Sequence, residues 1–438
     1  MTSSVQPLRP VPAPKGLEHA FVMNQAATYT NAAVTELAER YGEIFVFGFG
    51  PIRFHWLVGA EALAFVLTHP ENFSLKRAYS FLQVIGGDTA LITSDEPEHV
   101  ARRRLVQPAF HGRRVAAWAE CISERNAAFF ETLPGDMPVN LHARIKPHIL
   151  SLITELLLGS DTLAHLPALQ PNISAMMRFA NSPFLAQQLK VNLPGTPWQQ
   201  FLRARAKVDH LLYKDIARRK TTEPTDDILG MLLEVKNEAG DGLSDVELRD
   251  QAVSLVSAGF ETTTAALTWA VYLLLEHPNI LHKLRDEVGG LGARDILKNP
   301  YLDAVIKETL RLYPTAPAGL RQTVTDVVYK DYLLPEGSLV AYSIYATHRQ
   351  EEAFAEPLKF RPERWLNGFA PAPFTYLPFG YGARYCIGAQ LATTLIKLSL
   401  AQMLGVCGLE PAWTRPIEET GNTVQPKGGL PVRVTHLR

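Results

Sequence analysis

The stretch Phe379-Gly-Tyr-Gly-Ala-Arg-Tyr-Cys-Ile-Gly388 decides how the rest of this 438-residue sequence is interpreted. It places Cys386 in a turn between glycines, and apolar residues at helical spacing follow from Leu391 to Met403. A thiolate beside the N-terminus of that helix would meet free amide donors and the positive end of the helix dipole, which stabilise its charge. The glycines on both sides would allow a flat ligand to approach the backbone closely. The pattern therefore predicts that Cys386 is a ligand-binding thiolate.

The other two cysteines are Cys121 and Cys407, which lie far from one another in the sequence. Three distant cysteines form neither a disulfide framework nor a CxxC zinc site, and they are typical of a reducing compartment. A buried structural role is the commoner one for a lone cysteine, and we assign it to Cys121 and Cys407. Thiolate chemistry is therefore expected at Cys386 alone.

The cysteine loop resembles the F-x-x-G-x-R-x-C-x-G motif of the cytochrome P-450 family, the haem-thiolate monooxygenases, in its soluble bacterial type. The matching residues are Phe379, Gly382, Arg384, Cys386 and Gly388. The resemblance implies haem b (iron protoporphyrin IX) as the cofactor, with the Cys386 thiolate as the axial ligand of the iron. It also implies that Phe379 and Gly388 contribute to the haem-binding loop.

Glu308 and Arg311 are three positions apart in a predicted helix that ends before Pro314, so their side chains share one face. Such a pair by itself is most often a surface salt bridge of little energetic value. The family has an E-x-x-R pair at this point, joined by an arginine from a P-E-R-W-like segment, which here is Pro362-Glu-Arg-Trp365. By resemblance, Glu308, Arg311 and Arg364 form a structural triad behind the haem loop and have no catalytic role.

A long helix is predicted from Ser244 to Glu276. Ser244-Asp-Val-Glu247 is a capping box at its start, and His277-Pro278 ends it. Its middle carries Gly259 and a run of threonines, which are poor helix formers. The sequence therefore predicts a local distortion of this helix.

The hexapeptide Ala258-Gly-Phe-Glu-Thr-Thr263 resembles the family's [AG]-G-x-[DE]-T-[TS] motif, which lies over the distal face of the haem. Reduction of oxygen at the iron needs protons and the exclusion of bulk water. The resemblance implies Thr262 and Glu261 as the catalytic residues for proton delivery, and Ala258 and Gly259 as haem contacts. Without the cysteine loop, the ordinary interpretations are a threonine bonded to the carbonyl of Ala258 and a solvated glutamate.

The segment Asp95-Glu-Pro-Glu-His99, followed by Arg103, resembles the family's H-x-x-x-R helix, which binds a haem propionate. The resemblance adds Arg321, on a later strand, and Arg384 as further propionate partners. Arginine suits this role because its planar fork offers paired donors to a carboxylate. The ordinary interpretation of His99 is a surface histidine.

The resemblance implies a mainly α fold with a small β region: the single triangular cytochrome P-450 fold, with the haem between a long distal helix and the proximal cysteine loop. Length alone predicts two or three domains, and the resemblance overrides that count. We expect a proline-rich arm at residues 1–15 and a single haem-binding monooxygenase domain at residues 16–438. Segments rich in β-formers predict a hairpin about Gly50-Pro51 and a second strand region. Their ranges are Glu43–Phe49 with Ile52–Val58, and Val324–Tyr329 with Ser338–Ser343.

Composition and charge exclude several classes of protein. With 43 basic and 44 acidic residues the net charge is −1, which supplies no global attraction to nucleic acid or anionic lipid. The longest strongly apolar stretch, Ala265 to Leu275, is shorter than the roughly 20 residues of a membrane span. Prolines from Pro7 to Pro14 interrupt the pattern that a signal peptide requires. We therefore expect a soluble, cytoplasmic protein with no nucleic-acid partner and no membrane span. We also expect a monomer.

The expected activity is O2-dependent hydroxylation of an apolar small molecule. The sequence carries no flavin or nicotinamide motif, so a separate ferredoxin or flavodoxin with its reductase is expected to supply the electrons. Arginines at 102–104, 113 and 114 offer a basic face to an acidic ferredoxin, although solvation explains Arg102 and Arg104 as well. The alternatives are a peroxide-driven peroxygenase, which in this family replaces the acid–alcohol pair, and a non-catalytic haem-thiolate gas or redox sensor. The pair Glu261-Thr262 favours the monooxygenase.

The substrate pocket is expected to be apolar and to accept a long molecule, fatty-acyl or isoprenoid, such as a retinoid or carotenoid. Apolar residues occupy the regions that line the pocket in relatives, although such stripes are often plain core. The residues assigned to the pocket are Phe81, Leu82, Phe184, Ala258, Pro317 and Ala318.

Overall fold

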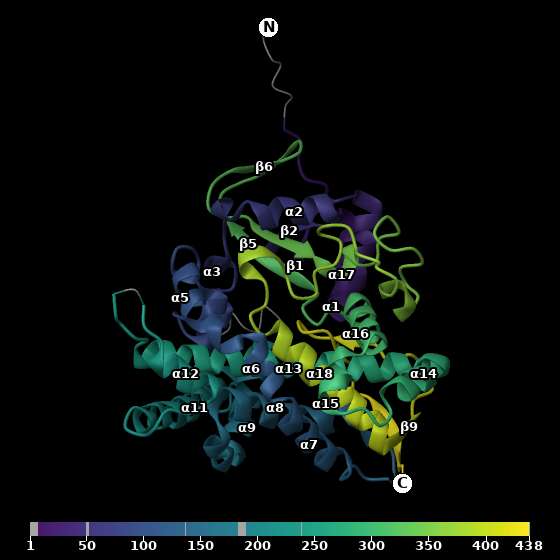
Figure 1. The fold of residues 1–438 in the computed structure, drawn as a ribbon. Coiled ribbons are helices and arrows are strands. Elements are labelled where there is room, and N and C mark those ends of the chain that lie inside the picture. Colours follow the sequence, from purple (N-terminus) through teal and green to yellow (C-terminus); the bar gives the residue numbers. More distant parts are fainter. Residues whose placement is uncertain (1–7, 50–51, 136, 183–189, 238, 438) are drawn as a thin grey trace. The chain divides into compact units, whose positions relative to one another are not determined.

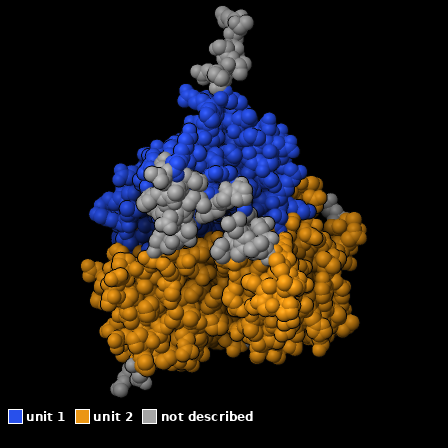
Figure 2. Space-filling view, turned by 180° about the vertical axis from the view of Figure 1, so that it is seen from behind, with its two compact units in different colours: residues 1–80, 310–386 blue, residues 81–309, 387–438 orange. Residues whose placement is uncertain are grey.

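The computed structural model describes residues 8–49, 52–135, 137–182, 190–237 and 239–437. The described chain is mostly helical with a smaller share of strands, as the sequence predicts (Figure 1). It forms two compact units, each built from separate stretches of sequence (Figure 2). The first unit comprises residues 1–80 and 310–386, and the second comprises residues 81–309 and 387–438. The single domain over residues 16–438 stays a prediction.

The first unit contains a five-stranded sheet with the strand order β1-β2-β8-β5-β3. Figure 1 labels three of its strands, β1, β2 and β5. β1 and β2 are the antiparallel strands of the predicted hairpin, whose turn lies outside the described residues, and β2 pairs with β8 in parallel. The strands are β1 Ile44–Phe49, β2 Ile52–Leu57, β3 Phe73–Ser74, β5 Ala318–Thr323 and β8 Leu339–Ser343. Two short helices of this unit are α3 Leu75–Ala78 and α17 Ile344–Thr347.

Helices cover the sheet of the first unit through two apolar clusters. Phe45 of β1 lies in the cluster formed with α1 (Gly16–Tyr41), and its neighbour Ile44 lies in the cluster formed with α2 (Ala60–Thr68). Both side chains are almost fully buried. Because successive residues of a strand point to opposite faces, the alternation in the hairpin separates these two cores.

Both segments of the second predicted strand region contain a strand, but the two strands do not pair with each other. Ser338–Ser343 is found as β8, but β8 pairs with β2 and β5 rather than with Val324–Tyr329. Only the end of that segment is a strand, β6 (Val327–Tyr329), and it pairs with β7 (Tyr332–Leu334) in a separate two-stranded ribbon. Lys330 has a φ of 53°, in the left-handed region that tight turns use, so the strands beside this short turn pair with each other. The local hairpin thus forms in place of the longer connection.

The second unit is built around α13 (Asp245–Glu276), which packs against α8 (Leu141–Leu158), α11 (Pro197–Arg219) and α18 (Ala389–Val406). The helix predicted after the cysteine loop is confirmed as α18. Its other described helices are α5 Glu98–Val106, α6 Gly112–Ala117, α7 Ala119–Phe130, α9 Leu166–Ala180, α12 Ile228–Glu234, α14 Pro278–Val288 and α15 Ala293–Lys298. Its described strands are β4 Val139–Asn140, β9 Cys407–Pro411, β10 Glu419–Thr420, β11 Gln425–Pro426 and β12 Pro431–His436. A boundary of the two units falls at or within α4 (Ser80–Gly86) and α16 (Pro300–Leu312).

The capping box predicted for the long helix α13 is present. The Ser244 hydroxyl accepts a hydrogen bond from the Glu247 amide at 3.3 Å, and the Glu247 carboxylate accepts one from the Ser244 amide at 3.0 Å. The predicted distortion near Gly259 is not found, because α13 is an unbroken α-helix. Tertiary packing on nearly every side outweighs the weak helix propensity of its threonines. No helix of the described residues, α13 included, is long and apolar enough to cross a membrane.

Removal of the capping hydroxyl should destabilise α13. We expect Ser244→Ala to lower the free energy of unfolding by about 1 kcal/mol, because the Glu247 amide loses its acceptor. Ser244→Asp is the matched control, since an aspartate at this position also accepts from that amide. Chemical denaturation followed by far-ultraviolet circular dichroism measures both variants. An equal loss in the two variants would contradict a capping role.

Candidate functional site

Cys386 lies at the end of the first unit, in the loop that leads into α18. Its amide donates a hydrogen bond to the carbonyl of Phe379 at 2.8 Å, which closes the loop. Gly380 and Gly382 have φ values of 75° and 59°, where a side chain would be strained. Cys386 is exposed, and an added Cβ at Gly388 would meet no atom within 4 Å. Because the protein itself does not require a glycine at that position, the loop fits a flat group that approaches its backbone.

The three cysteines lie in different environments. Burial raises the pKa of Cys121 and raises the pKa of Cys407 to about 11, which favours the protonated thiol at both. Cys407 is fully buried after the end of α18, and its Sγ donates to the carbonyl of Phe130 at 3.6 Å. Both environments suit a structural thiol. Cys386 alone is exposed and precedes a helix N-terminus, so it is the candidate for an iron ligand.

The central helix α13 has one narrow accessible stripe. From Leu248 to Leu275 its residues are buried, with four exceptions that are partly or fully exposed: Leu255, Ala258, Gly259 and Thr262. They share one face of the helix because they are spaced three or four positions apart. The small side chains at the centre of the stripe leave room for a flat ligand against the helix. The structure thus brings three of the predicted residues, Ala258, Gly259 and Thr262, onto one surface of the second unit.

The hydroxyl of Thr262 is hydrogen-bonded within its own helix. It donates to the carbonyl of Ala258 at 2.7 Å, and the carbonyl of Gly259 is 3.4 Å away. The ordinary interpretation of a back-bonded threonine is therefore correct as geometry. Because the hydroxyl proton is engaged, the lone pairs of the oxygen are what Thr262 offers to a ligand on the stripe.

Glu261 is buried, so the ordinary interpretation of a solvated glutamate is wrong. Its side chain is 3% exposed and pairs with Lys146, whose Nζ is 2.6 Å from Oε1. Oε2 accepts hydrogen bonds from Asn181 at 2.5 Å and from Gln425 at 3.3 Å. The carboxylate is therefore satisfied by one cation and two amides. Glu261 and Thr262 have different surroundings although they are adjacent in the sequence.

No local sequence pattern predicts the hydrogen-bond partners of Glu261, because all three lie far from it in the chain. Lys146 belongs to α8, Asn181 follows α9 and Gln425 belongs to β11, at separations of 115, 80 and 164 residues from Glu261. Burial and the nearby charge of Lys146 lower the pKa of His142, one turn earlier in α8, to about 4. His142 is therefore neutral near pH 7, and Lys146 is the cation beside the carboxylate.

The residues expected to bind propionates belong to both units. In the second unit, His99 and Arg103 lie one turn apart in α5, and His99 is 2% exposed rather than a surface histidine. In the first unit, Arg321 lies in β5, is 8% exposed and donates to the carbonyl of Leu320 at 2.8 Å. That bond uses one of its five N–H donors, so the guanidinium keeps donors suited to a carboxylate. Arg384 lies in the cysteine loop and is partly exposed.

The arginines expected to form a solvated or partner-facing cluster are partly paired within the second unit. Arg102 is 19% exposed and lies 3.8 Å from Glu247, so it is not a solvated side chain. Arg114 pairs with Asp226 at 2.8 Å. Arg104 is exposed, as expected. The predicted basic face is therefore reduced by internal ion pairs.

The members of the expected structural triad have scaffold contacts. Glu308 and Arg311 lie one turn apart in α16, and both are fully buried, unlike a surface salt bridge. Arg311 donates to three backbone carbonyls between residues 348 and 359, at 3.0, 2.6 and 3.1 Å. Arg364 donates to two carbonyls of the same segment, at 2.8 and 3.3 Å. Both arginines thus hold the chain that leads to the cysteine loop, and the triad as a unit stays a prediction.

The residues expected to contact substrate are accessible where they are described. Phe81 and Leu82 of α4 are partly exposed, and so are Pro317 and Ala318 at the start of β5. Phe184 lies outside the described residues. The assignment of these residues to one pocket stays a prediction.

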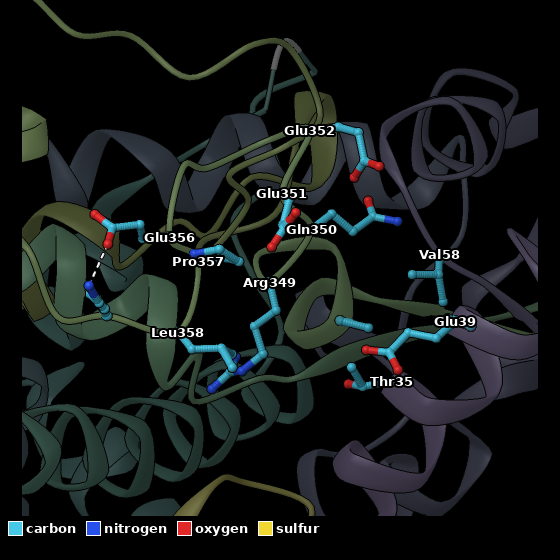
Figure 3. A pocket seen from close by; sticks show the side chains of 13 residues that line it. Thr35, Glu39, Val58, Arg349, Gln350, Glu351, Glu352, Glu356, Pro357 and Leu358 are labelled. Atoms are coloured by element: carbon cyan, nitrogen blue, oxygen red, sulfur yellow. Dashed lines mark hydrogen bonds and ion pairs between the residues drawn. The ribbon is translucent and has the colours of Figure 1, made fainter.

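The first unit also contains a pocket of about 650 Å³, which none of the predicted site residues lines (Figure 3). Thr35 and Glu39 of α1 lie on one side of it, and the segment from Arg349 to Lys359 lies on the other. This segment supplies three carboxylates, and Glu356 is paired with Lys359. Walls with so many charged groups do not suit an apolar substrate. We therefore do not assign this pocket to substrate.

The sequence matches the family model described as Cytochrome P450 over residues 12–431. It is 33% identical over 371 residues to a protein named Putative cytochrome P450 139 from Mycobacterium tuberculosis, a match that covers 82% of this chain and 86% of that protein. It is 30% identical over 392 residues to Putative cytochrome P450 137 from the same species, with coverage of 87% and 81%.

Two solved structures resemble the fold over almost the whole chain. A retinoic acid bound cyanobacterial CYP120A1 has a TM-score of 0.87 and 27% identity, and the match covers 98% of this chain and 100% of that one. The heme domain of cytochrome P450DA has a TM-score of 0.87 and 24% identity, with coverage of 99% and 98%. At 24% identity, the second match supports a similarity of fold alone.

Loss of the cation beside Glu261 should destabilise the second unit. We expect Lys146→Met to lower the free energy of unfolding by about 2–4 kcal/mol, because the buried carboxylate loses its charged partner. The double variant Lys146→Met/Glu261→Gln should regain most of that loss, since a neutral amide needs no cation. Urea denaturation of the four proteins closes a double-mutant cycle. A coupling below about 0.5 kcal/mol would place this contact with ordinary surface pairs.

Proposed function

Because the chain belongs to the cytochrome P450 family, we propose that it hydroxylates a long apolar molecule at a haem whose iron is ligated by Cys386. The proposed substrate class is fatty-acyl or isoprenoid, such as a retinoid or carotenoid. The exposed thiol of Cys386, in a glycine loop before the N-terminus of α18, is the observation that carries the haem assignment.

Family membership establishes the general activity. The chain is a haem-thiolate monooxygenase, an oxidoreductase that uses O2, electrons from redox partners and a small-molecule substrate. Its cofactor is haem with a cysteine thiolate ligand. The sequence predictions of family, fold class, enzyme class and cofactor are therefore confirmed.

We assign the haem contacts to residues that fit the group. When bound, a haem with a thiolate ligand supplies the electron density that favours cleavage of the O–O bond. The open part of the α13 stripe, with its small side chains, would lie against the ring. The proposed contacts are the iron ligand Cys386, the loop residues Phe379 and Gly388, the helix residues Ala258 and Gly259, and the propionate partners His99, Arg103, Arg321 and Arg384.

We assign proton delivery to Thr262 and Glu261. The Thr262 hydroxyl would accept a hydrogen bond on the accessible stripe, because its own proton is held by the carbonyl of Ala258. Glu261 would supply protons from the buried side of α13. To do so it would exchange one of its three donors, Lys146, Asn181 or Gln425, for water, since its carboxylate is otherwise satisfied. This acid–alcohol pair favours the O2-dependent reaction over the peroxygenase alternative.

An apolar substrate is supported by the partly exposed apolar side chains of α4 and of the start of β5. It is also supported by the likeness to a protein whose structure is titled as bound to retinoic acid. Large apolar ligands bind where hydrophobic side chains remain accessible to them. The substrate residues Phe81, Leu82, Ala258, Pro317 and Ala318 are therefore kept as proposals.

We propose a separate ferredoxin or flavodoxin, with its reductase, as the electron donor. Arg104 of α5 is exposed and could meet an acidic partner. Arg102 and Arg114 form ion pairs with Glu247 and Asp226. The contact with a donor would then depend on few of the predicted arginines. A monomeric state and a cytoplasmic location stay predictions.

Replacement of the ligating cysteine should remove the thiolate signature of the iron. We expect Cys386→Ala to lose the red-shifted ferrous carbonyl band that thiolate ligation produces, because no other exposed cysteine precedes a helix N-terminus. Cys121→Ala and Cys407→Ala are the matched controls and should keep the band. Retention of the band in Cys386→Ala would refute the assignment.

Removal of the Thr262 hydroxyl should uncouple electron use from product formation. We expect Thr262→Ala to keep its haem content and carbonyl spectrum, while product formed per NAD(P)H oxidised falls about tenfold and peroxide rises. Thr263→Ala is the matched control, because the neighbouring hydroxyl is buried and lies off the accessible stripe. The measurement pairs product and peroxide with NAD(P)H consumed in the reconstituted system. Equal coupling in the two variants would mean that protons arrive by another route.

A further inference from the structure

A second polar cluster of α13 lies about three helical turns before Thr262. It consists of Arg249, Asp250 and Gln251, whose relative exposures are 1%, 3% and 0%. All three side chains bond to the segment at residues 86–91, which begins at the last residue of α4. These three residues are neither among the proposed haem contacts nor part of the Glu261–Thr262 pair proposed for proton delivery. We call residues 249–251 together with segment 86–91 the Thr89 clamp.

Thr89 is held by side chains at every one of its polar groups. Its amide and its hydroxyl donate to Oδ2 of Asp250, at 3.0 and 2.7 Å. Its carbonyl accepts from the side-chain amide of Gln251 at 2.7 Å, and the oxygen of that amide accepts from the Leu91 amide at 3.1 Å. Backbone groups are usually satisfied by a helix or a sheet. Here two neighbouring side chains of α13 replace the missing secondary structure and set the register of the segment.

Arg249 connects the clamp to a third element. Its guanidinium donates to Oδ1 of Asp209 in α11 at 2.7 and 2.5 Å, and to Oδ1 of Asp250 at 2.9 Å. It also lies 3.4 Å from the carbonyl of Gly86. One buried cation thus ties α11 and α13 to the end of α4. A shift of any of these elements would leave a buried charge without a partner, which is costly.

The glycines at the end of α4 fit the clamp closely. Gly87 has a φ of 92°, and an added Cβ would lie 2.0 Å from Oδ1 of Asp250. An added Cβ at Gly86 would lie 3.3 Å from the Cβ of Ser254. The requirement for glycine at position 87 therefore comes from the carboxylate of the clamp as well as from the backbone conformation.

The clamp brings the last residue of α4 against α13, one position before the accessible stripe begins. Gly86 ends α4 against Ser254, and Leu255, the next residue, is the first member of the stripe. The clamped end of α4 is buried, whereas Phe81 and Leu82 near its start are partly exposed. The clamp is therefore the fixed end of a short helix whose apolar side chains remain accessible.

We propose that Arg249, Asp250 and Gln251 are positioning residues that hold α4 as a wall of the substrate site and so determine which sizes of apolar ligand fit beside the haem. The inference rests on the proposed function in that α4 contacts substrate. If the clamp is loosened, α4 can move at its attached end. The affinity for a bulky ligand that contacts α4 then changes, whereas the affinity for a small ligand that does not reach α4 stays the same.

Two haem-ligating azoles of different size test the clamp without the natural substrate. Imidazole binds the iron alone, whereas the phenyl group of 4-phenylimidazole would also contact the protein around the iron. Each azole is titrated into the ferric protein, and its binding is followed by the shift of the Soret band. We expect Thr89→Val and Gln251→Glu to change the ratio of the two dissociation constants about three- to tenfold, the equivalent of one buried hydrogen bond. Hydrogen exchange of peptides spanning residues 80–92 should accelerate in the same variants, with exchange in α8 unchanged.

Two further variants are matched controls. Thr89→Ser keeps the hydroxyl that donates to Asp250. Ser254→Ala removes a hydroxyl that donates to the carbonyl of Gln251, within its own helix, at 3.1 Å. Both should keep the wild-type ratio and exchange rates. An unchanged ratio in Thr89→Val and Gln251→Glu would overturn the proposal. An equal loss of affinity for both azoles, together with loss of haem, would also overturn the proposal, because it would show that these residues serve the general stability of the protein.

The substrate class is tested separately with a series of fatty acids of increasing chain length and with a retinoid. If none of them produces a low-to-high-spin shift in the wild type while the azole ratios respond as expected, the proposed substrate class is wrong and the clamp stands. If they do produce it, Thr89→Val should bind the longer members with a changed affinity and leave the carbonyl spectrum intact. A chain-length profile identical to that of the wild type would count against the clamp.

Discussion

Burial of α13 along most of its length is the constraint on which the second unit depends. A polar side chain on a buried helix must find a partner, because a buried group left unpaired costs about 1–3 kcal/mol. Asp250 meets this requirement through Thr89, and Glu261 meets it through Lys146. Each solution ties the helix to a segment far away in the sequence. The polar residues of α13 therefore hold its neighbours in place as much as they serve chemistry.

The interruption of that burial is equally informative. Over a helix that is otherwise enclosed, accessibility is confined to one face that runs from Leu255 to Thr262. Small residues at its centre expose backbone and let a flat group approach, and the Thr262 hydroxyl is the polar atom on that face. The contrast with Glu261, one position earlier and fully enclosed, follows from helical geometry, because adjacent residues point about 100° apart. The buried carboxylate of Glu261 and the accessible hydroxyl of Thr262 therefore lie on different sides of one helix.

The first unit carries an exposed cysteine, Cys386, in a loop outside its helices and its sheet. The chain that leads to the cysteine loop is irregular, so its carbonyls need donors. Arg311 and Arg364 supply them from buried or partly buried positions, and the amide of Cys386 closes the loop on Phe379. An arginine suits this task because a single guanidinium donates in several directions at once. A rigid scaffold thus supports a loop whose cysteine stays exposed.

The sequence by itself determined the family, the cofactor, the capping box of α13 and the hairpin of β1 and β2, because each depends on residues that are close together in the chain. It also separated Cys386 from Cys121 and Cys407 by local pattern. The tertiary structure alone decided that β8 pairs with β2 and β5, that Glu261 is buried beside Lys146, and that Thr89 is held by Asp250 and Gln251. The tertiary structure also decided that α13 stays helical through Gly259, because packing around the helix outweighs the low helix propensity of its residues. Apart from the pairing of β8 with β5, the contacts named here join segments more than a hundred residues apart. Such hydrogen bonds exist only once the distant segments have packed together, so no local pattern in the sequence records them.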